Sequence, residues 1–201
     1  MIRFVLFVML ASVLSSTQEV FAQRRSSVVE VGPQLTQIYL PVNPVGSVQY
    51  QPGIGGVFSA RLYKTLGLDF GISTTPTIPI SSTSFAGGRL TEGFFGTRAG
   101  LVIGRLGVYG KARPGFVSFG EAILHTGATP GSGFQFGRLT EPAFDIGGIA
   151  LVRVSTHFSV RYEMSDTIIR YGSRTIEPSF PPVPSRVVNC LQFATGFVAR
   201  F

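Results

Sequence analysis

The chain has 201 residues, enough for one domain or two small ones. It contains 25 Gly, 18 Phe and no Trp, and 13% of its residues are charged, about half the usual share. This composition is not typical of a cytosolic enzyme and favours a β-rich chain whose outer surface need not contact water. The net charge is +7, but the basic residues are dispersed and an export signal precedes them, which argues against nucleic acid as a partner.

The N-terminus has the pattern of a secretory signal peptide. Arg3 precedes an apolar run from Phe4 to Leu14, which is too short to span a bilayer, and Val20-Phe21-Ala22 offers small residues at the cleavage positions. We predict a signal peptide over residues 1–22 and a single mature domain over 23–201, with an uncleaved N-terminal anchor as the alternative. No later stretch of 18 apolar residues predicts a transmembrane helix.

Alternation of apolar and polar residues recurs along the mature chain and predicts eight strands. Their expected ranges are 28–40, 50–63, 66–75, 92–103, 106–120, 143–154, 158–171 and 187–201. Tight connections near residues 64, 104–105 and 155–157 alternate with long ones over 41–49, 76–91, 121–142 and 172–186. An even number of strands with short turns at one end and long loops at the other is typical of bacterial outer-membrane barrels.

Charged residues fall almost wholly on one face of these strands. In the seventh strand Phe158, Val160, Tyr162 and Met164 share one face, and Ser159, Arg161 and Glu163 share the other. A sheet in lipid must close on itself to pair its backbone groups. The sequence therefore predicts an all-β fold: a closed, eight-stranded, antiparallel, up-and-down transmembrane β-barrel with an apolar outer face and a charged lumen.

Three segments resemble the small eight-stranded outer-membrane barrels of the OmpA-transmembrane and opacity-porin type. "GVYGKARPG" resembles a central strand of that family, "GGIALVRVSTHFSVRYEMSD" its penultimate hairpin, and "FATGFVARF" its terminal strand. The resemblance implies residence in the outer membrane. It also implies recognition of the last strand by the barrel-assembly machinery, with Phe193, Phe197 and Phe201 as the assembly signal.

Eight strands leave an interior that side chains can fill. Unpaired charges there are costly, so the inward residues are expected to form a lumen ion network. Its expected members are Glu30, Arg61, Asp69, Arg98, Lys111, Arg113, Asp145, Arg153, Arg161, Glu163 and Arg200. A filled lumen favours a structural or surface-interaction role carried by the extracellular loops. The alternative is a small-solute porin or channel; a channel for hydrophobic solutes would need an apolar lumen.

Enzymatic chemistry finds little support in the sequence. "HFS" at residues 157–159 resembles the His-x-Ser of lipid A deacylase barrels, and Glu163 is the candidate third group. His157 lies at a short turn, however, on the side away from the outer leaflet, so we predict no catalysis and keep a lipid-modifying enzyme as a remote alternative. His125 has no partner ligands and Cys190 is single, so no metal, cofactor or disulfide is expected.

The pentapeptide GRLTE occurs twice, at residues 88–92 and 137–141, each time at the end of a long loop. Duplication, or two similar positions at the rim, is one explanation. The other is that Arg89 and Arg138 contact lipopolysaccharide phosphates, joined by Arg174 and Arg186, because guanidinium groups match phosphate geometry. The expected partners are thus outer-membrane lipid, lipopolysaccharide and the assembly machinery, and we expect a monomer.

Overall fold

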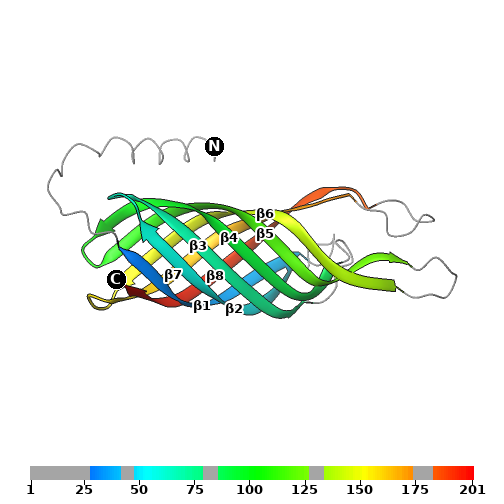
Figure 1. The fold of residues 1–201 in the computed structure, drawn as a ribbon, viewed down its shortest axis with the longest axis horizontal. Coiled ribbons are helices and arrows are strands. Elements are labelled where there is room, and N and C mark those ends of the chain that lie inside the picture. The colour runs from blue at the N-terminus through cyan, green and yellow to red at the C-terminus, as the bar shows by residue number, and fades with distance from the viewer. Residues whose placement is uncertain (1–27, 42–47, 79–85, 127–133, 174–182) are drawn as a thin grey trace.

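The computed structural model describes residues 28–41, 48–78, 86–126, 134–173 and 183–201. They form eight strands in one closed barrel (Figure 1). The strands are β1 (Val29–Pro41), β2 (Val48–Arg61), β3 (Leu66–Ile78), β4 (Ala86–Ile103), β5 (Leu106–Thr126), β6 (Phe134–Arg153), β7 (Phe158–Tyr171) and β8 (Arg186–Arg200). The predicted fold is confirmed. The predicted signal peptide, residues 1–22, lies outside the described residues.

Each strand pairs antiparallel with the next, and β1 pairs with β8 to close the barrel, with Glu30 opposite Arg200 and Tyr39 opposite Leu191. The short connections between β2 and β3, β4 and β5, and β6 and β7 lie at the same end as the C-terminus, on the left in Figure 1. In the second of them Gly104 has a φ of 60°, which favours glycine. In this architecture the end with short turns faces the periplasm.

Three strands extend further towards the outside than the alternation predicts. β4 begins at Ala86 where residue 92 was expected, β5 ends at Thr126 where 120 was expected, and β6 begins at Phe134 where 143 was expected. Both GRLTE copies therefore lie inside strands, which corrects their expected position in long loops. His125 also lies in β5, with its backbone opposite Gln135.

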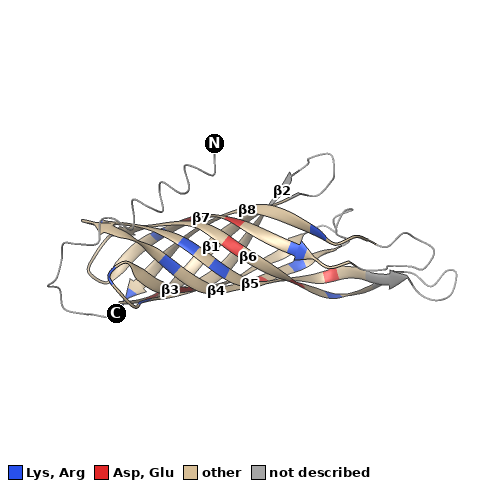
Figure 2. Ribbon diagram, turned by 90° about the horizontal axis from the view of Figure 1, so that it is seen from above, with Lys and Arg blue, Asp and Glu red and all other residues tan. Residues whose placement is uncertain are grey.

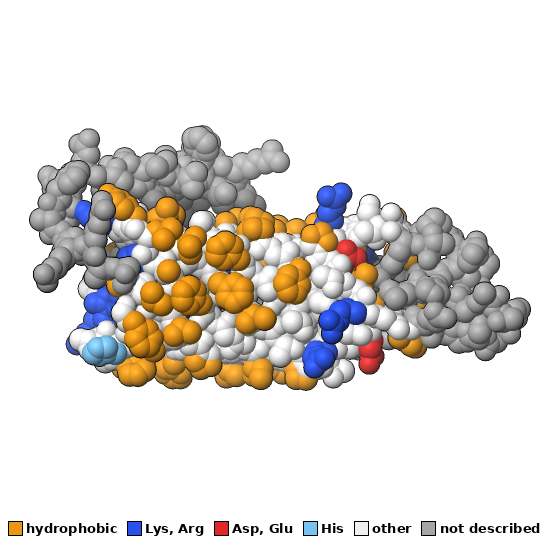
Figure 3. Space-filling model, in the orientation of Figure 1, with side chains coloured by type: hydrophobic (Ala, Val, Ile, Leu, Met, Phe, Trp, Pro, Cys, Tyr) orange, Lys and Arg blue, Asp and Glu red, His pale blue; other side chains and the backbone are white. Residues whose placement is uncertain are grey.

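The outer wall of the barrel carries an apolar belt (Figure 3). Its exposed side chains include Leu35, Ile54, Phe58, Leu66, Phe70, Ile72, Phe95, Leu101, Ile103, Leu106, Val108, Phe116, Phe144, Ile146, Val152, Phe158, Tyr162, Met164, Leu191, Phe193, Phe197 and Phe201. An exposed apolar surface of this size is unfavourable in water and is compatible with the acyl chains of a bilayer. Among the described residues, no helix is long and apolar enough to cross a membrane.

The inward face holds two kinds of side chain in separate regions. Most of the buried charged residues come from the middle and the periplasmic ends of the strands, and Glu141 of β6 is buried nearer the outer end. Figure 2 shows where charged residues lie along the strands. A buried apolar cluster fills the opposite end, made of Ile38, Ile78, Ala86, Leu90, Phe94, Val117, Phe119, Ala122, Ala143, Ile169, Tyr171 and Cys190. A smaller one, of Val57, Tyr109, Ile149, Leu151 and Val198, lies in the periplasmic half.

Candidate functional site

The centre of the lumen is crossed by an ion cluster of six side chains from four strands, and we call it the central cluster. Its members are Asp69 of β3, Lys111 and Arg113 of β5, Asp145 of β6, and Arg161 and Glu163 of β7. Inward-facing positions alternate along each strand, so Lys111 and Arg113 point into the lumen together, as do Arg161 and Glu163.

Two arginines hold the central cluster together. Arg113 lies 2.7 Å from Asp69 Oδ2, 2.6 Å from Asp145 Oδ2 and 3.3 Å from Glu163 Oε2. Arg161 donates from Nη1 and Nη2 to the two oxygens of Asp69, at 2.9 Å each, and from Nε to Glu163. Planar guanidinium groups suit this bridging of several carboxylates.

Charge within the central cluster balances. The three carboxylates of Asp69, Asp145 and Glu163 face the three cations of Lys111, Arg113 and Arg161, and all six side chains are at most 4% exposed. Ser59 completes it: its hydroxyl donates to Asp69 Oδ1 at 2.6 Å and accepts from Arg161 Nη1 at 2.9 Å. Mutual pairing and hydrogen bonds are what make buried charges tolerable.

A second, smaller group of charges lies nearer the periplasm. Arg98 Nη2 donates to Glu30 Oε2 at 2.6 Å, and Arg200 Nε lies 3.3 Å from Glu30 Oε1. Arg61 and Arg153, the other predicted network members, are half-buried at the same end and form no ion pair among the described residues. The mouth of the barrel thus has more cations than anions.

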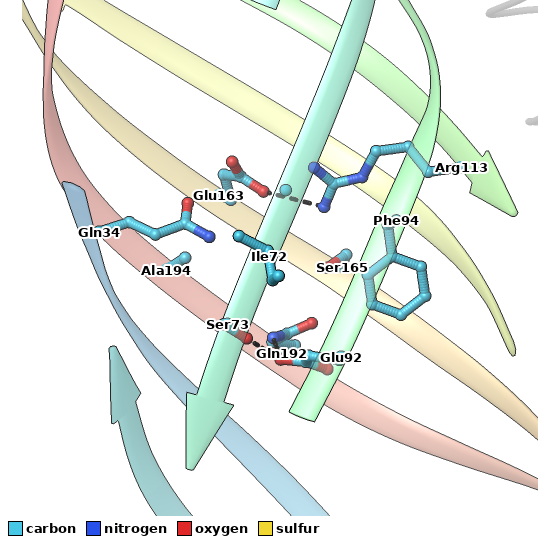
Figure 4. Close-up of a pocket in the computed structure, with 11 residues that line it drawn as sticks. Gln34, Ile72, Ser73, Glu92, Phe94, Arg113, Glu163, Ser165, Gln192 and Ala194 are labelled. Carbon is cyan, nitrogen blue, oxygen red and sulfur yellow. Dashed lines mark hydrogen bonds and ion pairs between the residues drawn. The ribbon is translucent and has the colours of Figure 1, made fainter. Parts of the chain in front are cut away.

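On the outer side of the central cluster lies a polar layer around Glu92, shown in Figure 4. Glu92 is 2% exposed and accepts hydrogen bonds from Ser73 and Gln192, but no Lys or Arg of the described residues forms an ion pair with it. Glu92 Oε2 and Gln34 Oε1 are buried without a hydrogen bond, beside a cavity of about 10 Å³. A space of that size holds one water molecule.

Beyond Glu92 the lumen becomes mainly apolar, which corrects the prediction of a charged lumen. Glu141 is also buried there and accepts from the Gly172 N–H at 3.3 Å. We call the larger buried cluster defined above the apolar cap. Phe119 and Tyr171 stack across it with ring centroids 5.9 Å apart. The signal was present in the sequence: on the inward face of β5, Lys111 and Arg113 give way after Gly115 to Val117 and Phe119.

The two GRLTE copies orient their side chains alike. Arg89 and Arg138 are exposed on the outer wall, whereas Leu90 and Leu139 belong to, or pack against, the apolar cap. Arg186 instead turns to Tyr171, with its guanidinium carbon 5.3 Å from the ring centroid. Arg174 lies outside the described residues.

The hydrolase constellation is not assembled. His157 is exposed and its Nδ1 lies 2.9 Å from Thr156 Oγ1, whereas Ser159 is 2% exposed and faces the lumen. Glu163 is engaged with Lys111, Arg113 and Arg161. In the described part of the chain no hydrogen bond joins the three candidate groups, and no group of His, Cys, Asp and Glu side chains has the arrangement of a metal site.

The last strand presents its phenylalanines to the outside. Phe193, Phe197 and Phe201 are 36%, 67% and 76% exposed, whereas Cys190, Gln192 and Val198 of the same strand are buried. The three predicted assembly-signal residues therefore belong to the apolar belt.

No protein-family model and no curated protein matches the sequence. Solved structures do resemble it in fold. Neisserial surface protein A, from Neisseria, superimposes with a TM-score of 0.53 at 12% identity, over 87% of this chain and 97% of that one. Ail, the attachment invasion locus protein of Yersinia pestis, in complex with the heparin analogue sucrose octasulfate, gives 0.52 at 11% identity, over 87% and 97%.

The N-terminal β-barrel domain of Pseudomonas aeruginosa OprF gives a TM-score of 0.50 at 13% identity, over 88% of this chain and 100% of that domain. Identities this low establish the fold and nothing finer. The closed ladder and the apolar belt are observations on this chain itself. The chain therefore has the fold of the small eight-stranded outer-membrane β-barrels and is built to span the bacterial outer membrane.

Proposed function

We propose that the protein is a sealed outer-membrane barrel with a structural or surface-interaction role, and that it conducts no solutes. The observation that carries this proposal is that two layers of side chains, one after the other along the barrel, fill the lumen. The central cluster crosses the barrel with charges that satisfy one another, and the apolar cap fills the lumen on its outer side.

The two layers exclude solutes for different physical reasons. Passage through the central cluster requires separation of buried ion pairs, which costs several kcal/mol for each charge left without a partner. Passage through the apolar cap requires removal of the water shell from any polar solute. The small cavities beside Glu92 and Glu30 have volumes of about 10 Å³ each, enough for a water molecule only.

Single-channel recording in planar bilayers tests the seal. The refolded wild type is expected to give no steady conductance of solute size. Because the layers lie in series, the double substitution Leu90→Ala/Phe119→Ala, which thins the apolar cap, is expected to leave conductance at the wild-type level. A steady, large conductance from the folded wild-type monomer would refute the proposal and support the porin alternative.

We further propose that Arg89 and Arg138 bind lipopolysaccharide phosphates. Both side chains are exposed on the outer wall, on strands that continue beyond the apolar belt. The double substitution Arg89→Gln/Arg138→Gln is expected to reduce the lipopolysaccharide that copurifies with the folded barrel. The same amount with variant and wild type would contradict this contact.

A further inference from the structure

The periplasmic mouth of the barrel concentrates positive charge around a single carboxylate. The small cavity there is lined by Arg61 of β2, Arg105 of the turn between β4 and β5, Arg153 of β6 and Arg200 of β8, which we call the mouth arginines. Glu30 is the one acidic residue that lines it, and Glu30 is already bound by Arg98 at 2.6 Å. Four cations thus line a cavity with one carboxylate, which pairs with Arg98 and, at 3.3 Å, with Arg200.

The mouth arginines are held close together by the backbone. The Arg153 N–H donates to the Arg105 carbonyl at 2.8 Å, which brings the end of β6 against the β4–β5 turn. Arg61, Arg153 and Arg200 line the same small cavity. Like charges gathered in this way repel one another, and an anion that binds among them removes that cost.

Two buried guanidinium nitrogens at the periplasmic end have no hydrogen-bond acceptor. Arg98 is 2% exposed, and its Nη1 has no hydrogen-bond partner; Arg200 Nε is also buried without one. Among the described residues, Arg61, Arg105 and Arg153 form no ion pair. Buried guanidinium donors are rarely left unsatisfied, and the cavity of about 10 Å³ beside Arg200 has room for one water molecule that accepts from it.

The chain neighbours of the mouth arginines identify where such an anion comes from. Arg105 follows Ile103 and Gly104 and precedes Leu106, and both apolar side chains are exposed, at 71% and 43%. Arg153 lies between Val152 and Val154, at 40% and 62% exposed. These side chains form the lower edge of the apolar belt, so the mouth arginines lie at the depth where lipid headgroups meet water.

We propose that the mouth arginines bind the headgroup phosphate of an anionic phospholipid in the periplasmic leaflet. Guanidinium groups match phosphate oxygens in two-point geometry. The cavity of about 10 Å³ admits no headgroup, so the phosphate lies across the mouth and is reached first by Arg105, which is exposed. The site fixes the depth of the barrel in the membrane from the periplasmic side.

Native mass spectrometry of the folded protein in zwitterionic detergent tests the site, with phosphatidylglycerol as probe and phosphatidylcholine of the same chain length as reference. The wild type is expected to retain phosphatidylglycerol preferentially. Arg105→Gln/Arg153→Gln is expected to weaken retention by about tenfold or more. Arg170→Gln removes an exposed cation at the outer end of β7 and is expected to change the retention of phosphatidylglycerol by less than about twofold.

Three results would overturn the proposal. Equal retention of the two lipids by the wild type, or equal loss of retention in Arg105→Gln/Arg153→Gln and in Arg170→Gln, would mean that no site exists at the mouth. Inorganic phosphate that displaces phosphatidylglycerol at an equal concentration would mean that the site takes a free anion and not a lipid. Gel mobility without boiling confirms that each variant is folded before the comparison.

Discussion

Removal of one carboxylate from the central cluster tests whether the lumen is dry. Asp69 is 0% exposed and accepts four hydrogen bonds, from Ser59 Oγ, from Arg113 Nη1 and from two nitrogens of Arg161. Asp69→Asn keeps the shape of the side chain but removes its charge and turns an amide towards the guanidinium groups. The cluster then holds three cations and two carboxylates.

Loss of one partner from a buried ion pair costs about 3–5 kcal/mol. Arg113 keeps Asp145 and Glu163, and Arg161 keeps Glu163, so neither cation is left alone. We therefore expect the lower part of that range, about 3 kcal/mol, for Asp69→Asn. Arg161→Gln in the same chain restores the balance of charge, and the double variant is expected to lose at least about 1 kcal/mol less than the sum of the single losses.

The free energy of unfolding is measured by urea titration of the protein in phosphatidylcholine vesicles. Because the chain has no Trp, the folded fraction is read from migration of unboiled samples on SDS gels. Asp166→Asn is the matched control, because Asp166 is a half-buried residue of β7 whose carboxylate accepts from Asn189 at 3.0 Å on the outer wall. If Asp69→Asn loses no more stability than this control, water reaches the cluster and the sealed-barrel argument fails.

Four other outcomes are expected. The folded protein should migrate differently on SDS gels before and after boiling; a helix-dominated circular dichroism spectrum would contradict the fold. Phe201→Ser should lower the amount assembled in the outer membrane more than Phe95→Ser, another exposed belt residue, and equal yields would reject the assembly signal. Ser159→Ala should leave lipid A acylation unchanged by mass spectrometry, whereas disappearance of a deacylated species would indicate catalysis. Leu90→Ala in the apolar cap should cost about 2–5 kcal/mol, and a loss no larger than that of lipid-facing Leu101→Ala would argue against tight packing there.

The alternation of apolar and polar residues predicted the strand bounds best where the outer face of the barrel wall contacts lipid. β7 was predicted with the bounds that the structure shows, Phe158 to Tyr171, because its outward residues are apolar and its inward ones polar. In β6 the segment from Phe134 to Pro142 continues beyond the belt, where the outward positions include Arg138 and Thr140. Beyond the belt the outer face can be polar as well, so apolar and polar residues no longer need to alternate. For this reason the GRLTE copies were predicted to lie at the ends of loops.

The lumen was less predictable than the wall. The inward positions of Asp69 and Glu163 follow from strand parity, but which cation meets which carboxylate depends on strand tilt and stagger. The apolar cap was missed because Val117 and Phe119 continue the inward face of β5 after the charged pair, and an apolar residue on either face fits a transmembrane strand.

The central cluster also constrains the order of events during folding. The Arg161–Asp69 contact joins residues 92 positions apart, and the Arg98–Glu30 contact joins residues 68 apart, so neither can form within a single hairpin. An open sheet that entered the bilayer would present these charges to acyl chains before their partners arrived. Insertion and closure are therefore expected to proceed as one concerted step. Its barrier is high because the chain loses entropy in bringing distant residues together before their contacts stabilise it.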